Sequence, residues 1–156
     1  MNTLFRNAVI VLFLLSEVGD IVKTKLVKLL FLADYKAREG LGRKISNFEY
    51  VRYLYGPYPR DIETVLAYLE AKGVIGYEER INQRGDTYYL IYPKRSDFEE
   101  SLKAIPHGKE VAPSEEEKAI LHEIAEAYGQ KSLEEILEEV YDMGVLKEVP
   151  FAEPIL

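Results

Sequence analysis

The stretch that decides the expected fold is PRDIETVLAYLEAKGVIGYEERINQRGDTYYLIY, residues 59–92. In its first part, apolar residues over 62–69 recur at the i, i+3, i+4, i+7 spacing of a helix, and a Lys-Gly pair at 72–73 is expected to end that helix. Two runs of strand-forming residues, 74–81 and 87–92, then flank a short polar loop that contains a glycine. This pattern predicts a helix followed directly by a β-hairpin.

Two more helices are expected upstream of this stretch. The first, over 3–18, contains the apolar run AVIVLFLL, whose eight residues fall far short of the about 20 that a membrane-spanning helix needs. We interpret it as a helix buried on nearly all sides. The second helix is expected to begin near Asp20 or Thr24, either of which could cap it, and to continue to Glu39. Its apolar side carries Leu26, Leu29, Leu30 and Ala33, and its opposite side carries Lys25, Lys28 and Lys36.

The segment between the second helix and residue 59 changes character. Aromatic and β-branched residues predict a short strand over 49–54. Gly56-Pro57-Tyr58-Pro59 is then expected to turn the chain, because two prolines that lack an N–H group exclude a regular β-ladder across these four residues. Pro59 would occupy the first turn of the helix that follows.

The sequence after residue 92 predicts a connector and two closing helices. Residues 93–113 are expected to be irregular, with a helical turn near 98–103. The two helices are each opened by a capping box, Ser114 with Glu117 and Ser132 with Glu135. The last residues, VPFAEPIL, are apolar but interrupted by proline, so an extended tail is expected.

Together these elements predict a single, mainly helical α+β domain over residues 1–156. Residues 1–92 form its core: two N-terminal helices, a short strand, a helix and a β-hairpin, which is the layout of a winged helix. The connector 93–113 and the C-terminal helices and tail, 114–156, complete the domain.

The winged-helix layout raises DNA binding as an alternative function. In that fold the helix can enter a major groove while the hairpin contacts the backbone. The exposed face of this helix is slightly acidic, however, and acids that face phosphates are repelled. The net charge of −7 does not settle the matter, since residues 20–60 carry nine bases and four acids while 113–156 carry three and twelve. The candidate DNA-contacting residues are Arg60, Thr64, Arg80 and Arg84.

The composition argues against an enzyme. The sequence has no cysteine, which removes thiol nucleophiles, disulfides and Cys-ligated metals, and is compatible with a cytoplasmic location. A His122–Glu126 pair could offer only two metal ligands, too few for a site. No nucleotide-binding or hydrolase motif is present. We therefore expect no catalytic residues, no metal and no cofactor.

Tyrosine is the most distinctive residue type. Twelve tyrosines occur, and nine of them lie within residues 50–92. Tyrosine combines a large apolar area with a hydroxyl group, which favours interfaces. Tyr53, Tyr55 and Tyr58 lie close in sequence to Arg52 and Arg60, at a turn made rigid by proline. This aromatic and arginine cluster is a candidate docking surface for a peptide or a partner protein.

Three segments resemble a known family. KLVKLLFLAD, residues 25–34, resembles the KLxKLLYxAD helix of the Panacea domain, the SocA-like antitoxin family. Tyr55-Gly56-Pro57 resembles the YGP turn of that family, and residues 114–142, with their YG-x-x-S pattern, resemble its closing pair of helices. The likeness covers roughly residues 1–145.

This resemblance implies an antitoxin that neutralises a toxin encoded beside it, in a bacterium, an archaeon or a phage. The first hypothesis is thus a cytoplasmic, non-enzymatic protein that binds a cognate protein toxin; the alternative is a winged-helix regulator that binds DNA. No membrane partner is expected, and a homodimer is plausible because the apolar first helix and the tail both need cover. The expected partner-binding residues are Lys28, Arg52, Tyr53, Tyr55, Gly56, Pro57, Tyr58 and Arg60.

Overall fold

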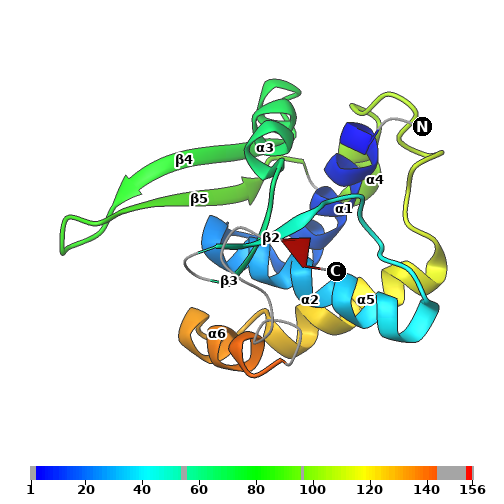
Figure 1. The fold of residues 1–156 in the computed structure, drawn as a ribbon. Coiled ribbons are helices and arrows are strands. Elements are labelled where there is room, and N and C mark those ends of the chain that lie inside the picture. Colours follow the sequence, from blue (N-terminus) through cyan, green and yellow to red (C-terminus); the bar gives the residue numbers. More distant parts are fainter. Residues whose placement is uncertain (1–2, 54–55, 96, 144–153, 156) are drawn as a thin grey trace.

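A computed structural model describes residues 3–53, 56–95, 97–143 and 154–155. The chain is α+β and about half helical, with two small antiparallel sheets (Figure 1). Its elements in chain order are α1 (Thr3–Val18), β1 (Ile21–Val22), α2 (Lys23–Leu41), β2 (Tyr50–Tyr53), β3 (Gly56–Pro59), α3 (Ile62–Ala71), β4 (Ile75–Ile81), β5 (Thr87–Pro93), α4 (Phe98–Leu102), α5 (Glu115–Tyr128), α6 (Leu133–Tyr141) and β6 (Pro154–Ile155).

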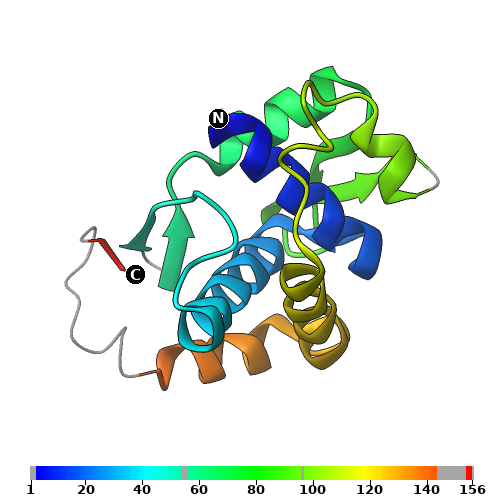
Figure 2. The ribbon, with the colours of Figure 1, turned by 90° about the vertical axis from the view of Figure 1, so that its right-hand side faces the viewer.

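Helix α2 lies at the centre of the molecule. It packs against α5 and α6 and against strands β3 and β5, and every residue over 26–34 is buried (Figure 2). Helix α1 is buried over 7–12, which confirms the prediction of a helix enclosed on nearly all sides. Its cover comes from α3, α4 and α5 of the same chain, so α1 does not need a second copy. Within the described residues, no helix is long and apolar enough to cross a membrane.

The first sheet has the order β1-β5-β4 and contains the predicted hairpin. Strands β4 and β5 pair antiparallel from Ile75–Pro93 to Ile81–Thr87 and project away from the helices (Figure 1). Gly76 lies directly opposite Tyr92, and a Cβ atom at Gly76 would lie 2.0 Å from the Tyr92 ring. A glycine is therefore needed for the ring to cover this part of the strand.

The start of α2 differs from the prediction. The helix begins at Lys23, and its N-cap residue, Val22, makes no side-chain cap hydrogen bond. The preceding residues form strand β1 instead, with Ile21 paired to Ile91 of β5. The expected caps, Asp20 and Thr24, were therefore wrong, because pairing with the hairpin rather than side-chain capping fixes this end of the helix.

The expectation that no ladder crosses residues 56–59 is also wrong. These residues form β3, which pairs with β2 so that Pro59 faces Tyr50 and Pro57 faces Arg52. Pro57 and Pro59 are two residues apart, so the positions of their absent N–H groups lie on the same side of the strand. β3 lies at the edge of the sheet, where proline is tolerated. Pro59 is accordingly not part of the next helix.

The C-terminal elements follow the sequence closely. Both predicted capping boxes are formed, at the starts of α5 and α6. The predicted helical turn in the connector is helix α4. Within the predicted tail, residues 154–155 form β6, which pairs with β2; residues 149–153 and 156 lie outside the described part of the chain.

A polar network fixes the segment between α2 and β2 onto the helices. The Asp34 carboxylate accepts hydrogen bonds from the backbone N–H groups of Ile45 and Ser46, both at 2.8 Å, from the Ser46 hydroxyl, and from the Tyr50 hydroxyl at 2.6 Å. Arg6 of α1 donates to the carbonyl oxygen of Ile45 from the other side. This segment leads directly into β2, so the network positions the β2–β3 hairpin.

Candidate functional site

The exposed surface of the β2–β3 hairpin carries an aromatic cluster, which we call the tyrosine face and define as Val51, Tyr53, Tyr58 and Arg60. The strand register places Val51, Tyr53 and Tyr58 on the same side of the hairpin. The rings of Tyr53 and Tyr58 stack with centroids 5.2 Å apart, and Tyr53 is 50% exposed. The four residues line a shallow hollow, and Arg60 contacts Glu49 at 3.7 Å.

Lys23 and Glu63 hold Tyr58 in place from behind. The Lys23 ammonium lies 5.7 Å from the centre of the Tyr58 ring and 2.7 Å from Glu63, whose carboxylate also accepts a hydrogen bond from the Tyr58 hydroxyl. Burial and the hydrogen bond to Glu63 raise the pKa of Tyr58 to about 12. Burial alone would lower the pKa of Lys23, but its hydrogen bonds to Glu63 and Tyr58 outweigh that effect and raise it. Tyr58 therefore stays neutral, and Lys23 and Glu63 stay charged, over the physiological pH range.

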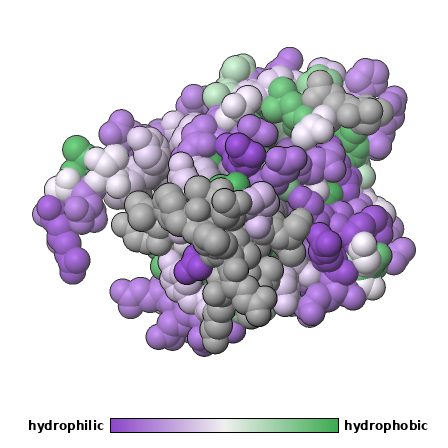
Figure 3. All heavy atoms as spheres, viewed as in Figure 1, coloured by the Kyte–Doolittle hydropathy of each residue, from purple (hydrophilic) through white to green (hydrophobic). Residues whose placement is uncertain are grey.

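The hairpin β4–β5 lies beside this cluster. Tyr89 of β5 approaches the same Lys23 ammonium, at 5.4 Å from its ring centre, and is 38% exposed. Ile81 of β4 is 70% exposed, and Figure 3 shows hydrophobic atoms near the far end of the projecting hairpin. Exposed apolar side chains thus continue from the tyrosine face onto the hairpin.

Lys28 is not on the polar side of α2, as the sequence led us to expect. It is only 2% exposed, and its ammonium donates a hydrogen bond to the carbonyl oxygen of Pro57 at 3.0 Å. Burial lowers its pKa to about 8. The prediction failed because α2 is enclosed by α5, α6 and β3 and so has no fully solvated side over this stretch.

Most of the expected partner-binding residues converge here. Tyr53, Tyr58 and Arg60 form the exposed face, with Pro57 and Lys28 directly beneath it. Gly56 has a φ of +95°, a backbone conformation that favours glycine, and a Cβ atom there would lie 3.6 Å from the Lys28 side chain.

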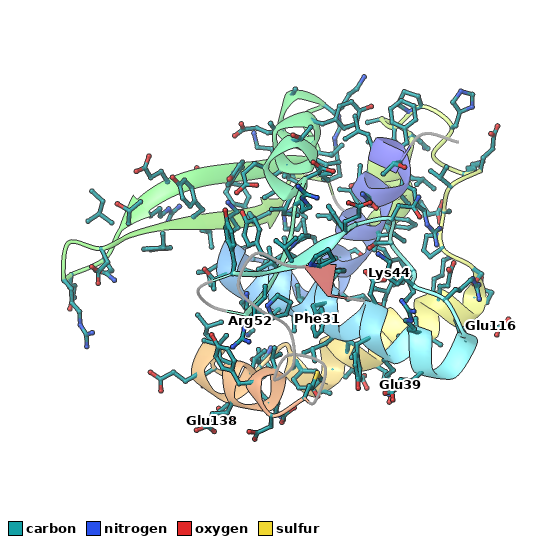
Figure 4. All side chains as sticks on the ribbon, in the orientation of Figure 1. Phe31, Glu39, Lys44, Arg52, Glu116 and Glu138 are labelled. Atoms are coloured by element: carbon teal, nitrogen blue, oxygen red, sulfur yellow. The ribbon has the colours of Figure 1, made fainter. Side chains whose placement is uncertain are left out.

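The two remaining expected residues are not part of the exposed face. Arg52 alternates with Tyr53 along β2 and is drawn between the hairpin and α6 in Figure 4. Tyr55 lies outside the described residues.

Sequence reasoning missed the supporting residues Lys23, Glu63 and Tyr89. Each comes from a different element, α2, α3 and β5, and the three meet only after the chain has folded. The alternation of the hairpin could have placed Tyr89 beside Tyr77, whose ring lies 5.7 Å away, but no local pattern connects either tyrosine to Lys23.

The residues proposed for DNA contact are scattered and partly neutralised. Arg80 pairs with Glu78 at 2.7 Å on the hairpin, and Arg84 lies in the hairpin turn. Thr64 is exposed on α3, a helix that also exposes the acidic side chains of Glu63 and Glu70. A groove-reading helix would bring these acids against phosphates.

Nothing in the described part of the chain resembles a metal centre. No group of three potential ligands is found there. His122 lies between two carboxylates, with ring nitrogens 3.2 Å from Glu17 and 3.1 Å from Glu126, and is exposed on α5.

The fold and this surface define a small α+β protein that displays an aromatic face, supported by the Lys23–Glu63 ion pair, on a short hairpin. A family model described as antitoxin SocA-like, Panacea domain, matches residues 26–144. The chain therefore belongs to the SocA-like antitoxin family, as the sequence resemblance indicated. The match begins within α2 and includes the β2–β3 and β4–β5 hairpins and both closing helices. Comparisons with curated proteins and with solved structures give no match.

Proposed function

We propose that this protein is a cytoplasmic antitoxin that neutralises a cognate protein toxin by binding it directly through the tyrosine face. The observation that carries the proposal is the stacked pair Tyr53–Tyr58, of which Tyr53 is half exposed, beside the exposed Arg60. Membership of the SocA-like family supports a toxin as the partner. The protein would act without catalysis, by covering the surface that the toxin needs.

The chemistry of the tyrosine face suits a tight protein interface. Tyrosine and arginine are enriched among the residues that contribute most binding free energy. The Tyr58 ring is already held by Glu63 and Lys23, so little side-chain entropy remains to be lost when a partner binds. The apolar side chains of the β4–β5 hairpin would extend the contact area.

Tyr53→Ala is expected to weaken toxin binding about 10–30-fold, because it removes the most exposed ring of the face. The measurement is the dissociation constant of the complex with the toxin encoded by the neighbouring reading frame, together with rescue of growth. Tyr128→Ala, on α5 and away from this face, is the matched control and should leave binding unchanged. Equal binding by wild type and Tyr53→Ala, with unchanged melting temperatures, would remove the tyrosine face from the interface.

A second candidate function rests on the arrangement of the first sheet. The element order α1, β1, α2, β2, β3, α3, β4, β5 and the strand order β1-β5-β4 support a winged-helix-like core over residues 1–92. The connector 93–113 and the closing helices and tail, 114–156, follow this core. Such a core would allow the protein to bind operator DNA as well as a toxin.

The DNA-binding candidate is tested by its salt dependence. Basic residues on the hairpin, Arg80 and Arg84, would contact phosphates, so binding should weaken steeply as salt rises. The measurement is retention of promoter DNA at 50 and 200 mM salt. If no DNA is retained even at 50 mM, this function is excluded while the toxin-binding proposal stands.

A further inference from the structure

A cavity of about 440 Å³ lies behind the tyrosine face. Its walls come from α2, the β2–β3 hairpin, β5 and α6, elements that are far apart in the sequence. A volume of this size is typical of pockets for small organic molecules and exceeds what a single side chain would fill. The residues that line it include Lys23, Lys28, Tyr53, Tyr58, Tyr89 and Leu133.

Two lysines line this cavity, Lys23 and Lys28, and their ammonium groups differ in their counter-charges. Lys23 is paired with Glu63 at 2.7 Å. Lys28, although 98% buried, has no carboxylate within 4.0 Å among the residues that the structure describes, and its ammonium donates to the Pro57 carbonyl oxygen. A buried charge without a charged partner is costly. An anion bound in the cavity beside Lys28 would supply the missing counter-charge.

The remaining walls are aromatic and aliphatic. The rings of Tyr53, Tyr58 and Tyr89 line the side toward the hairpins, and Leu133 lines the side toward α6. Such surfaces favour a flat or apolar body over a fully hydrated ion, because burial of apolar area is the main source of affinity in small-molecule pockets. Inorganic anions are thus a poorer fit than amphipathic ones.

We propose that this cavity binds a small organic carboxylate, with its apolar body packed against the tyrosine rings and its carboxylate paired with Lys28. The proposal goes beyond the antitoxin role and does not rest on it, since the cavity and its charges belong to the isolated chain. It would make the protein a receptor for a small molecule as well as a partner for a protein.

The experiment is calorimetric titration of the full chain at pH 7 with four carboxylates, namely benzoate, phenylacetate, indole-3-acetate and octanoate, each compared with its neutral amide. We expect at least one carboxylate to bind with a dissociation constant below about 1 mM and its amide to bind at least tenfold more weakly, a difference typical of a charge-assisted hydrogen bond. The amide comparison needs no variant.

Lys28→Met tests the residue itself. Methionine has nearly the same length, and replacing a buried, poorly paired charge with an apolar group is often neutral for stability, so the variant should remain folded. We expect it to bind carboxylate and amide equally. Lys36→Met, on the same helix but facing Glu123 at the surface, is the matched control and should bind like wild type.

A pH series distinguishes charge pairing between the ligand and Lys28 from burial of the ligand's apolar body alone. Because the pKa of Lys28 is about 8, its amine is protonated at pH 7 and mostly neutral at pH 9, so affinity for the carboxylate should fall about tenfold between these values. Lys23 and Glu63 keep their charges over this range, since the pKa of the lysine is raised and that of the carboxyl is lowered. Among the residues that the structure describes, the other titratable side chains that line the cavity are Tyr53, Tyr58, Tyr88 and Tyr89, and the Tyr141 ring lies close to Gly56, as Lys28 does.

Three outcomes would overturn the proposal. They are the absence of binding by all four carboxylates at 5 mM probe, equal affinity for carboxylates and amides, and a tenfold pH effect that persists in Lys28→Met. None of them bears on toxin binding, which is measured separately through Tyr53.

Discussion

Asp34→Ala is expected to lower the free energy of unfolding by about 3–5 kcal/mol, a large part of the about 5–15 kcal/mol that stabilises a typical domain. The Asp34 carboxylate is buried and accepts four hydrogen bonds, from two backbone N–H groups and from the hydroxyls of Ser46 and Tyr50. Alanine would leave these buried donors without an acceptor, and each unsatisfied group costs about 1–3 kcal/mol. Urea denaturation measures the loss.

Asp97→Ala is the matched control for this prediction. Asp97 is also an aspartate that accepts a backbone N–H, from Glu100, but it caps a short helix at the surface, where its removal should cost about 1 kcal/mol. Tyr50→Phe removes one of the four hydrogen bonds and should cost about 1–1.5 kcal/mol. If Asp34→Ala cost no more than Asp97→Ala, the network around Asp34 would not hold the segment in place.

The segment that Asp34 holds in place is also important for function. Residues 45–50 lead into β2, which carries Tyr53. Loss of the network should therefore weaken partner binding in proportion to the loss of folded protein, without changing any residue of the tyrosine face. This separates a positioning role from a contact role.

The parts of the fold that the sequence predicts are those determined by local patterns. The buried first helix, the hairpin around Gly85 and the capping boxes at Ser114 and Ser132 depend on periodicity and on residues at fixed spacing. Each of these was predicted nearly to its observed ends. Periodicity and spacing are visible in a single sequence, whereas contacts between distant elements are not.

Two of the errors, at residues 20–24 and 56–59, have one common physical cause, which is strand pairing that the residue types do not reveal. Strand β1 exists because Ile21 pairs with Ile91, seventy positions away. Strand β3 exists because it pairs with β2, and the absent N–H groups of Pro57 and Pro59 are not needed for that pairing. The residue types alone favoured a cap and a turn at these places.

The candidate site was predicted only in part, because some of its residues come from elements that are far apart in the sequence. Tyr53, Tyr58 and Arg60 are close in sequence and came together as expected. Lys28 was assigned to a solvated side because the helical periodicity of α2 says nothing about the elements that later cover that side. The apolar neighbours of this lysine, Val27 and Leu29, were the local sign of an enclosed position.

Arg6→Met is expected to lower the free energy of unfolding by about 2–4 kcal/mol. The Arg6 guanidinium donates hydrogen bonds to the carbonyl oxygens of Ile45 and Val111 and to the Glu117 carboxylate at 2.9 Å, and so joins α1 to the segment before β2, the connector and α5. Methionine fills similar space but donates nothing, which leaves Glu117 and two carbonyl oxygens short of a partner. Urea denaturation at pH 7 is the measurement.

Arg43→Met provides the control on the same carboxylate. Arg43 approaches Glu117 at 3.5 Å, but its side chain is more than half exposed, so its removal should change stability by less than about 0.5 kcal/mol. Equal losses in the two variants would show that Glu117 needs only a nearby positive charge and that the hydrogen bonds of Arg6 add nothing.

The pH dependence of the Arg6 effect identifies the ionic part of the interaction. Burial alone would raise the pKa of Glu117, but its hydrogen bonds to Ser114 and Arg6 outweigh burial and lower it below the ordinary value of 4.5. A lowered pKa means that the contribution of Glu117 to stability is complete above pH 4.5 and is lost as the pH falls through the folded-state value. The stability difference between wild type and Arg6→Met should therefore be constant from pH 7 to 5 and narrow at lower pH. The difference that remains after Glu117 is protonated measures the hydrogen bonds to Ile45 and Val111.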